Sequence, residues 1–165
     1  MSSRALLLLL ALLVAGCGFR LRGSVDVPFE TLYVPDAMSG IGLDLKRHLE
    51  AGTSARVVND PKQAQAILQI SNESRGREIL TLSGAGRVSE FQLRYQLSFR
   101  VHDGKGSEYL PSTTIALIRE MTFQDTQILA KEAEEQLLFR DMQAEAVQQI
   151  LRRMSGAQKP RPKVE

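Results

Sequence analysis

The segment 91–102 limits the fold more than any other part of this sequence, because apolar and polar residues alternate along it without a break. Successive side chains of a β-strand point to opposite faces of the sheet, so a period of two is typical of a half-buried strand. We therefore predict a strand with one face that another layer of the protein must cover. The apolar positions are Phe91, Leu93, Tyr95, Leu97, Phe99 and Val101, and Gln92, Arg94, Gln96, Ser98, Arg100 and His102 stand between them.

The residues after this strand predict the second half of a β-hairpin. Segment 102–106 contains an aspartate and two glycines, which are residues typical of tight turns. Segment 113–121 is rich in β-branched and apolar residues, so we expect it to form the returning strand.

Further strands are predicted upstream. Segment 31–34 reads TLYV and is followed by Pro35, which indicates a short strand that ends there. Segments 66–72 and 77–82 are two more candidate strands, and residues 73–76 separate them. These four residues fit either a bulge inside one long strand or a turn between two strands, and the sequence leaves both interpretations open.

A short amphipathic helix is predicted after the first strand. Residues 36–40 include types that are common in turns. The apolar residues Ile41, Leu45 and Leu49 then follow at intervals of four. Gly52 is a suitable stop. We expect the apolar face of this helix to lie on the sheet.

Segment 126–154 predicts one long helix, because it lacks proline and glycine and is rich in strong helix formers. We expect a first apolar stripe, interrupted by the polar Arg140, to pack on the sheet. A second patch on roughly the opposite side is expected to be covered either by the first helix or by another protein. The stripe comprises Ala130, Ala133, Leu137, Ala144, Val147, Leu151 and Met154, and the patch comprises Ile128, Phe139, Met142, Ala146 and Ile150.

The N-terminus predicts an export signal. Arg4 precedes an apolar run over residues 5–14, and small residues follow it. The run is about half as long as the roughly 20 residues that a helix needs to cross a bilayer, so residues 1–16 are interpreted as a signal peptide.

The cleavage region Val14-Ala15-Gly16-Cys17 resembles the lipobox of bacterial lipoproteins, in which the cysteine thiol receives a lipid. Cys17 is the only cysteine, so it has no intrachain partner, whereas exported proteins normally pair their cysteines. The alternative is an ordinary cleavage site followed by a chance cysteine. Gly18 in place of aspartate, by resemblance to the sorting rule of enterobacterial lipoproteins, favours the periplasmic side of the outer membrane.

The remaining chain predicts one lipidated periplasmic domain over residues 17–155 and a disordered basic tail over 156–165. There are 21 Lys and Arg residues against 19 Asp and Glu, so overall charge indicates no anionic partner, and tryptophan is absent. No nucleic-acid partner is expected.

Motifs for catalysis are missing from the sequence. It contains no nucleophile elbow, zinc-binding helix motif or phosphate loop, and neither His48 nor His102 stands in a ligand pattern. We therefore expect no catalytic residue, no metal site and no cofactor, and we interpret the chain as a protein without enzymatic activity.

Four short motifs resemble the LptE family of lipopolysaccharide-assembly lipoproteins, also called rare lipoprotein B. They occur in the family's order and at its spacing, and the resemblance covers nearly the whole mature domain. The motifs are Cys17-Gly18-Phe19-Arg20-Leu21-Arg22-Gly23, Ser89-Glu90-Phe91-Gln92-Leu93, Ile128-Leu129-Ala130-Lys131-Glu132 and Arg140-Asp141-Met142.

The resemblance implies an α+β fold in which two helices pack on one face of a four-stranded, mostly antiparallel sheet. It also implies a plug inside the outer-membrane β-barrel LptD, with which the family inserts lipopolysaccharide into the outer leaflet. The implied partners are therefore LptD, lipopolysaccharide and the membrane that holds the lipid anchor.

The family's lipopolysaccharide-binding positions transfer only in part. Lys131 matches one basic position, whereas the second falls near Gly84, which has no charge. Arg87 is a candidate substitute, and Arg94 and Arg100 on the polar side of the predicted strand are further candidates. The alternative for each is an ordinary solvated surface charge.

Two competing functions remain open at this stage. One is a periplasmic lipid-carrier lipoprotein that works without a barrel, and the other is an uncharacterised hydrolase. Copurification with a large β-barrel protein separates the plug from the carrier.

Overall fold

The computed structural model describes residues 26–159 of the chain. The predicted signal peptide, Cys17 and the last residues of the predicted tail lie outside this range, and the tail's first residues, 156–159, form no helix or strand beyond a turn at Gly156. Among the described residues, no helix is both long enough and apolar enough to cross a bilayer.

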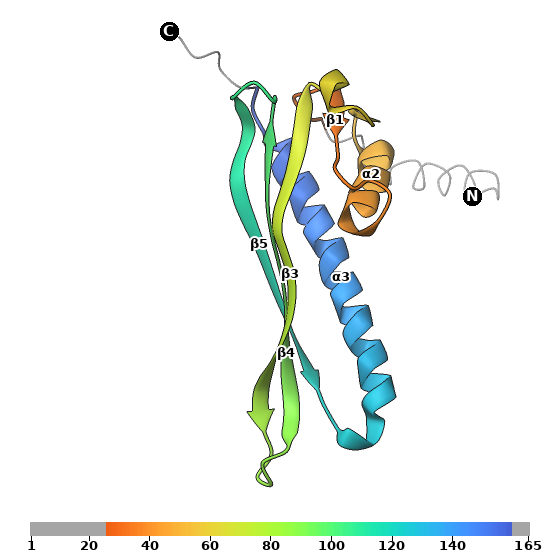
Figure 1. Cartoon of the computed structure of the whole chain (residues 1–165), viewed down its shortest axis with the longest axis vertical. Helices are drawn as coiled ribbons and strands as arrows, with labels where there is room; N and C mark the ends of the chain where they lie inside the picture. The colour runs from red at the N-terminus through yellow and green to blue at the C-terminus, as the bar shows by residue number, and fades with distance from the viewer. Residues whose placement is uncertain (1–25, 160–165) are drawn as a thin grey trace, which may run out of the picture.

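Five strands form one mixed sheet, in the order β2-β1-β3-β4-β5 (Figure 1). β1 runs parallel to both β2 and β3, whereas β3, β4 and β5 are antiparallel. The sheet therefore has five strands and not the four expected from the family resemblance. The missed strand is β2, whose three residues are too few to show an alternating pattern. The bounds are β1 Thr31–Tyr33, β2 Arg56–Val58, β3 Ala66–Leu82, β4 Val88–His102 and β5 Glu108–Thr122.

β4 confirms the prediction from alternation. Leu93, Tyr95 and Leu97 are fully buried on the face that carries the helices, and Arg94 and Arg100 are exposed on the other face.

β5 begins earlier than the predicted residue 113 and includes a proline. The register moves from Val101 opposite Leu110 to Phe99 opposite Thr113, so Pro111 and its neighbour form a bulge. Proline is tolerated there because β5 is an edge strand and the bulge removes the need for its amide hydrogen.

β3 is one long bulged strand, which decides between the two interpretations of residues 73–76. Its partner in β4 shifts between Ser71 opposite Ser98 and Ser74 opposite Gln96, so one extra residue is inserted. Asn72 takes a positive φ of 53° in this bulge, a backbone conformation that asparagine tolerates better than most residues.

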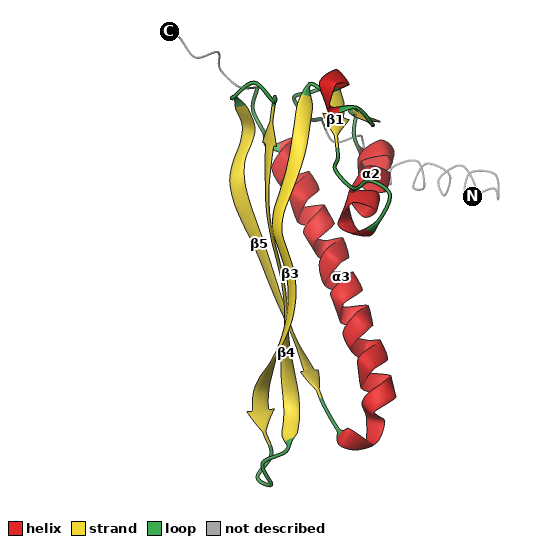
Figure 2. Ribbon diagram, in the orientation of Figure 1, coloured by secondary structure: helices red, strands yellow, loops and turns green. Residues whose placement is uncertain are grey.

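Two helices pack on one face of the sheet (Figure 2). The predicted short helix is confirmed as α2 (Gly40–Gly52), with Ile41, Leu45 and Leu49 buried. The predicted long helix is confirmed as α3 (Ile128–Ser155), and a single 3₁₀ turn at Asp125–Gln127 precedes it.

The predicted face of α3 is only partly right, because Val147 and Met154 of the expected stripe are fully buried but its other members are not. Leu137 of the expected stripe is 49% exposed, whereas Phe139, Met142 and Ile150 of the second patch are buried against the sheet and α2. Phe139, Met142 and Ile150 fill the core, whereas the alanines of the stripe and the large apolar residues Ile128 and Leu129 are exposed. Arg140 interrupted the expected stripe because that side of the helix is exposed.

The core is densest toward one end of an elongated molecule and reaches Leu93 and Met121 toward the other. β3 has its buried residues at its start, Ala66 and Leu68, and every residue from Ser71 to Leu82 is exposed. We call the end that contains α2 and the β4–β5 turn the proximal end. The opposite end, with the β3–β4 turn at 83–87 and the start of α3, is the distal end (Figure 1).

Candidate functional site

The distal end carries a group of exposed apolar side chains. Large hydrophobic residues are ordinarily buried, so several of them exposed at one end of a domain indicate an interaction surface. The hairpin and the first turn of α3 both contribute. We define the distal apolar surface as Ile79, Leu80, Leu82, Ile128 and Leu129, which are between 41% and 82% exposed.

Lys131 lies at this end but is held in place by neighbours. Its side chain is only 13% exposed, and its ammonium group lies 2.8 Å from Glu134 Oε2. The same nitrogen donates to Thr122 Oγ1 at 3.1 Å, which joins the start of α3 to the end of β5. Lys131 thus has a local structural role, and an incoming phosphate would have to share or replace these partners.

Arg87 closes the turn at the tip of the hairpin. Its backbone carbonyl accepts from the amide of Ser83 at 2.7 Å, and Gly86 supplies a positive φ of 73° that this tight turn requires. Among residues 26–159, Arg87 makes no ion pair. Its exposed guanidinium is therefore available to an anion.

Arg94 lies on the other face of the sheet from Lys131. Its guanidinium pairs with Glu78 at 3.2 Å and donates to Gln92 at 3.1 Å. Arg100, on the same face, donates to Gln69 and pairs with Glu108. The structure thus brings Lys131 and Arg87 to the same end of the molecule, and it places Arg94 on the uncovered sheet face.

Two arginines that sequence reasoning missed lie between the sheet and α3. Arg77 pairs with Glu135 at 2.7 Å, and its guanidinium lies 4.6 Å from the centre of the Phe91 ring. Arg75 lies over the rings of Tyr95 and Phe139. The bulge in β3 decides which face these residues take, so the sequence alone could not assign them.

Arg75 begins a polar chain that connects three elements. It donates to Gln143 Oε1 of α3 at 2.6 Å, and Gln143 Nε2 donates in turn to Asp44 of α2 at 2.7 Å. The buried amide therefore stands between a cation and a carboxylate, an arrangement that satisfies both of its polar atoms. This chain fixes α2 and α3 to each other and to β3.

Tyr95 makes a second polar contact beside this chain. Its hydroxyl donates to Glu73 Oε1 at 2.8 Å. Burial raises the pKa of Tyr95 above its ordinary value, and the hydrogen bond to Glu73 and the negative charge of that carboxylate raise the pKa further.

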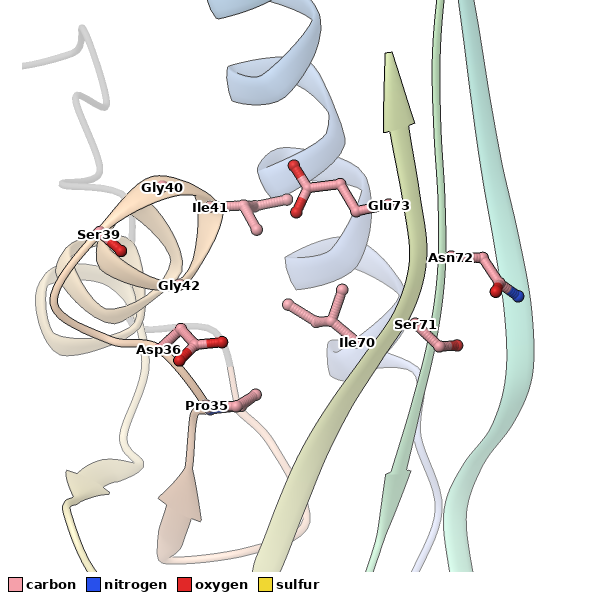
Figure 3. Close-up of a pocket in the computed structure, with 10 residues that line it drawn as sticks. All are labelled: Pro35, Asp36, Ser39, Gly40, Ile41, Gly42, Ile70, Ser71, Asn72 and Glu73. Atoms are coloured by element: carbon pink, nitrogen blue, oxygen red, sulfur yellow. The ribbon is translucent and has the colours of Figure 1, made fainter.

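A pocket of about 370 Å³ lies between the start of α2 and the bulge of β3 (Figure 3). Asp36 and Glu73 line it, together with Ile41 and Ile70. Its lining contains no basic residue, so it is unsuited to a phosphate. Within the described part of the chain, no group of histidine, cysteine and carboxylate residues could hold a metal ion.

The comparisons with known proteins agree on one family. The family model LptE, described as lipopolysaccharide-assembly, matches residues 24–154. The LPS-assembly lipoprotein LptE of Yersinia enterocolitica is 31% identical over 93% of this chain and 77% of its own length.

Solved structures of lipoproteins share the fold. An uncharacterized lipoprotein B from Nitrosomonas europaea superposes with a TM-score of 0.71 at 46% identity, over 84% of this chain and 90% of that one. The rare lipoprotein B from Shewanella oneidensis superposes with a TM-score of 0.65 at 24% identity, over 76% of this chain and 94% of that one, which shows a common fold.

Proposed function

The chain belongs to the LptE lipopolysaccharide-assembly family, and on that premise we propose that it plugs and supports the β-barrel LptD during lipopolysaccharide transport at the outer membrane. The family consists of structural lipoproteins without enzymatic activity. The proposed role therefore requires binding and not catalysis. The chain would bind the inner wall of a β-barrel protein and a phosphorylated glycolipid.

The observation that carries the proposal is the distal apolar surface. Most of the buried core residues lie toward the proximal end, whereas at the distal end Leu129 is 82% exposed and Ile79 is 58% exposed. Covering apolar surface contributes about 25 cal/mol per Å², so this end is stabilised when another molecule encloses it. A barrel lumen would enclose it from several sides.

The position of the chain's start supports a protein partner over the membrane itself. Phe29 packs edge to face on Tyr109 next to the β4–β5 turn, so the described chain begins at the proximal end. If Cys17 carries the lipid, residues 18–25 can span at most about 30 Å. The 28 residues of α3 alone extend about 42 Å toward the distal end. The anchored leaflet would therefore lie at the proximal end, and something else must cover the distal apolar surface.

Copurification tests this proposal. The full chain, affinity-tagged and extracted from its own membranes in mild detergent, should bring down a large β-barrel protein. Ile79→Asp combined with Leu129→Asp should lower the recovery of that protein, because each substitution places a charge on the enclosed surface.

Met38→Asp is the matched control. Met38 is 87% exposed but lies in the turn before α2, at the proximal end. Recovery of the barrel should be unchanged in this variant. If wild type recovers no barrel protein, the chain acts alone as a carrier and the plug proposal is wrong.

A further inference from the structure

Among the described residues, β5 has an unpaired edge along its whole length, and β3 has a second unpaired edge beyond Ile67. β5 ends the sheet on one side, and its residues 108–122 pair with β4 alone. Exposed edges of this kind can pair with a strand of another molecule, and folded proteins usually carry features that prevent it.

The sequence of β5 makes strand pairing favourable. Residues 113–118 read TTIALI, without a charge, a glycine or a proline, and four of the six are β-branched. Uncharged segments of this length with high β propensity are those that most readily pair between molecules. Ile118 is 47% exposed on the uncovered face of this segment.

The hydrogen bonds between β4 and β5 determine which backbone groups of β5 point toward its free edge. In an antiparallel pair, alternate residues direct both the amide and the carbonyl toward the partner strand, and the residues between them direct both away. The amide of Phe123 bonds to Ser89, so the odd-numbered residues of this part of β5 face β4. Thr114, Ala116 and Ile118 therefore present their backbone groups at the free edge.

Two of these three outward carbonyls are occupied by arginine side chains. Arg153, from the last turn of α3, donates to the Thr114 carbonyl at 3.3 Å. Arg119 donates to the Ile118 carbonyl at 2.9 Å, and its guanidinium also pairs with Glu145 of α3. Both cations are thus fixed at the edge by α3.

We propose that Arg119 and Arg153 guard the edge of β5 against strand pairing with a second copy of this chain. The edge is self-complementary around Ala116: in a two-fold antiparallel pair, Ala116 lies opposite its own copy and Thr114 lies opposite Ile118. No like charges meet in that arrangement, so the sequence of residues 113–118 does not oppose it. The two guanidinium groups occupy the acceptors that the second strand would need.

The test compares the oligomeric state of the wild-type full chain and of four variants by sedimentation velocity. The double variant Arg119→Ala/Arg153→Ala should associate, with an apparent dissociation constant at least about tenfold lower than that of wild type. The matched control is Arg140→Ala/Arg152→Ala, which removes two exposed arginines of α3 that make no ion pair with a described residue. This control should behave as wild type.

Adding Ala116→Lys to the double variant shows where association occurs, because it places two lysines opposite each other at the two-fold axis and should restore the monomer. Because Arg119→Ala also removes the ion pair with Glu145, the single variant Arg153→Ala is measured as well and should associate to a smaller extent. A double variant that stays monomeric would overturn the proposal. So would association that Ala116→Lys leaves unchanged.

Discussion

At the scale of single residues, Tyr95 connects the core to the pH dependence of stability. The hydroxyl is protonated in both the folded and the unfolded chain below about pH 10, the ordinary pKa of tyrosine. Above it, the unfolded chain releases this proton and the folded chain keeps it, because burial and Glu73 raise the pKa in the fold. The free energy of unfolding should therefore decrease as pH rises above 10, by at most about 1.4 kcal/mol per pH unit.

Denaturant unfolding of wild type and Tyr95→Phe, at about pH 9 and about pH 11, checks this expectation. The loss of stability between the two pH values should be smaller in Tyr95→Phe than in wild type. Tyr33→Phe is the control for the loss of a tyrosine elsewhere. Equal losses in wild type and Tyr95→Phe would show that the hydroxyl ionises as easily in the fold as outside it.

Met142 and Leu137 test which face of α3 is the core. Met142 is fully buried, whereas Leu137 is 49% exposed. Met142→Asp should lower the free energy of unfolding by several kcal/mol, because it buries an unpaired carboxylate. Leu137→Asp should change it by less than about 1 kcal/mol. Thermal unfolding by circular dichroism measures both, and similar melting temperatures for the two variants would contradict the packing of α3.

At the scale of elements, Gly42 sets how closely α2 approaches the turn before it. A Cβ atom on Gly42 would lie 2.5 Å from the backbone oxygens of Pro35 and Asp36, and backbone atoms cannot swing aside. Gly42→Ala should therefore cost about 1 to 3 kcal/mol. Gly52→Ala, at the other end of α2, meets no atom within 4 Å and should be neutral or stabilising. Denaturant unfolding should separate the two substitutions.

The elements themselves show how far sequence reasoning reaches. β4 was predictable because one face is buried from Leu93 to Val101 and the other is polar, so burial appears in the sequence as strict alternation. β2 was not predictable, because its three residues are too few to show an alternating pattern. The buried face of α3 was assigned only in part because small alanines were counted as core residues, although Phe139, Met142 and Ile150 fill the space against the sheet.

The candidate site was also predictable only in part from the sequence. The resemblance selected Lys131, and its pair with Glu134 has the i,i+3 spacing of a helix pair, but its contact with Thr122 joins two elements and leaves no sequence pattern. Arg75 and Arg77 were missed because one inserted residue in β3 determines which face they occupy. Register is a property of two strands together, so one strand's sequence does not settle it.

At the scale of the whole molecule, the two ends differ in chemistry. Most of the buried core residues lie toward the proximal end. The distal end combines exposed apolar side chains with the cations Arg87 and Lys131. A glycolipid that presents phosphates next to acyl chains matches that combination. We propose that lipopolysaccharide meets the chain at the distal end, with Arg87 as its first ionic contact because Lys131 is already paired with Glu134.

Binding of purified lipopolysaccharide to the full chain in detergent tests the distal contact. Arg87→Gln should weaken binding at low salt by no more than about fivefold, since an exposed charge pair contributes about 0 to 1 kcal/mol. Arg87→Gln combined with Lys131→Gln should weaken it further, because the partly buried ammonium is less screened by water. Both differences should shrink as salt increases, while binding through apolar contacts persists. Arg94→Gln removes an equal charge from the uncovered sheet face, so its affinity should stay at the wild-type value. If Arg94→Gln weakens binding as much as the double variant does, the glycolipid lies along the sheet and not at the distal end.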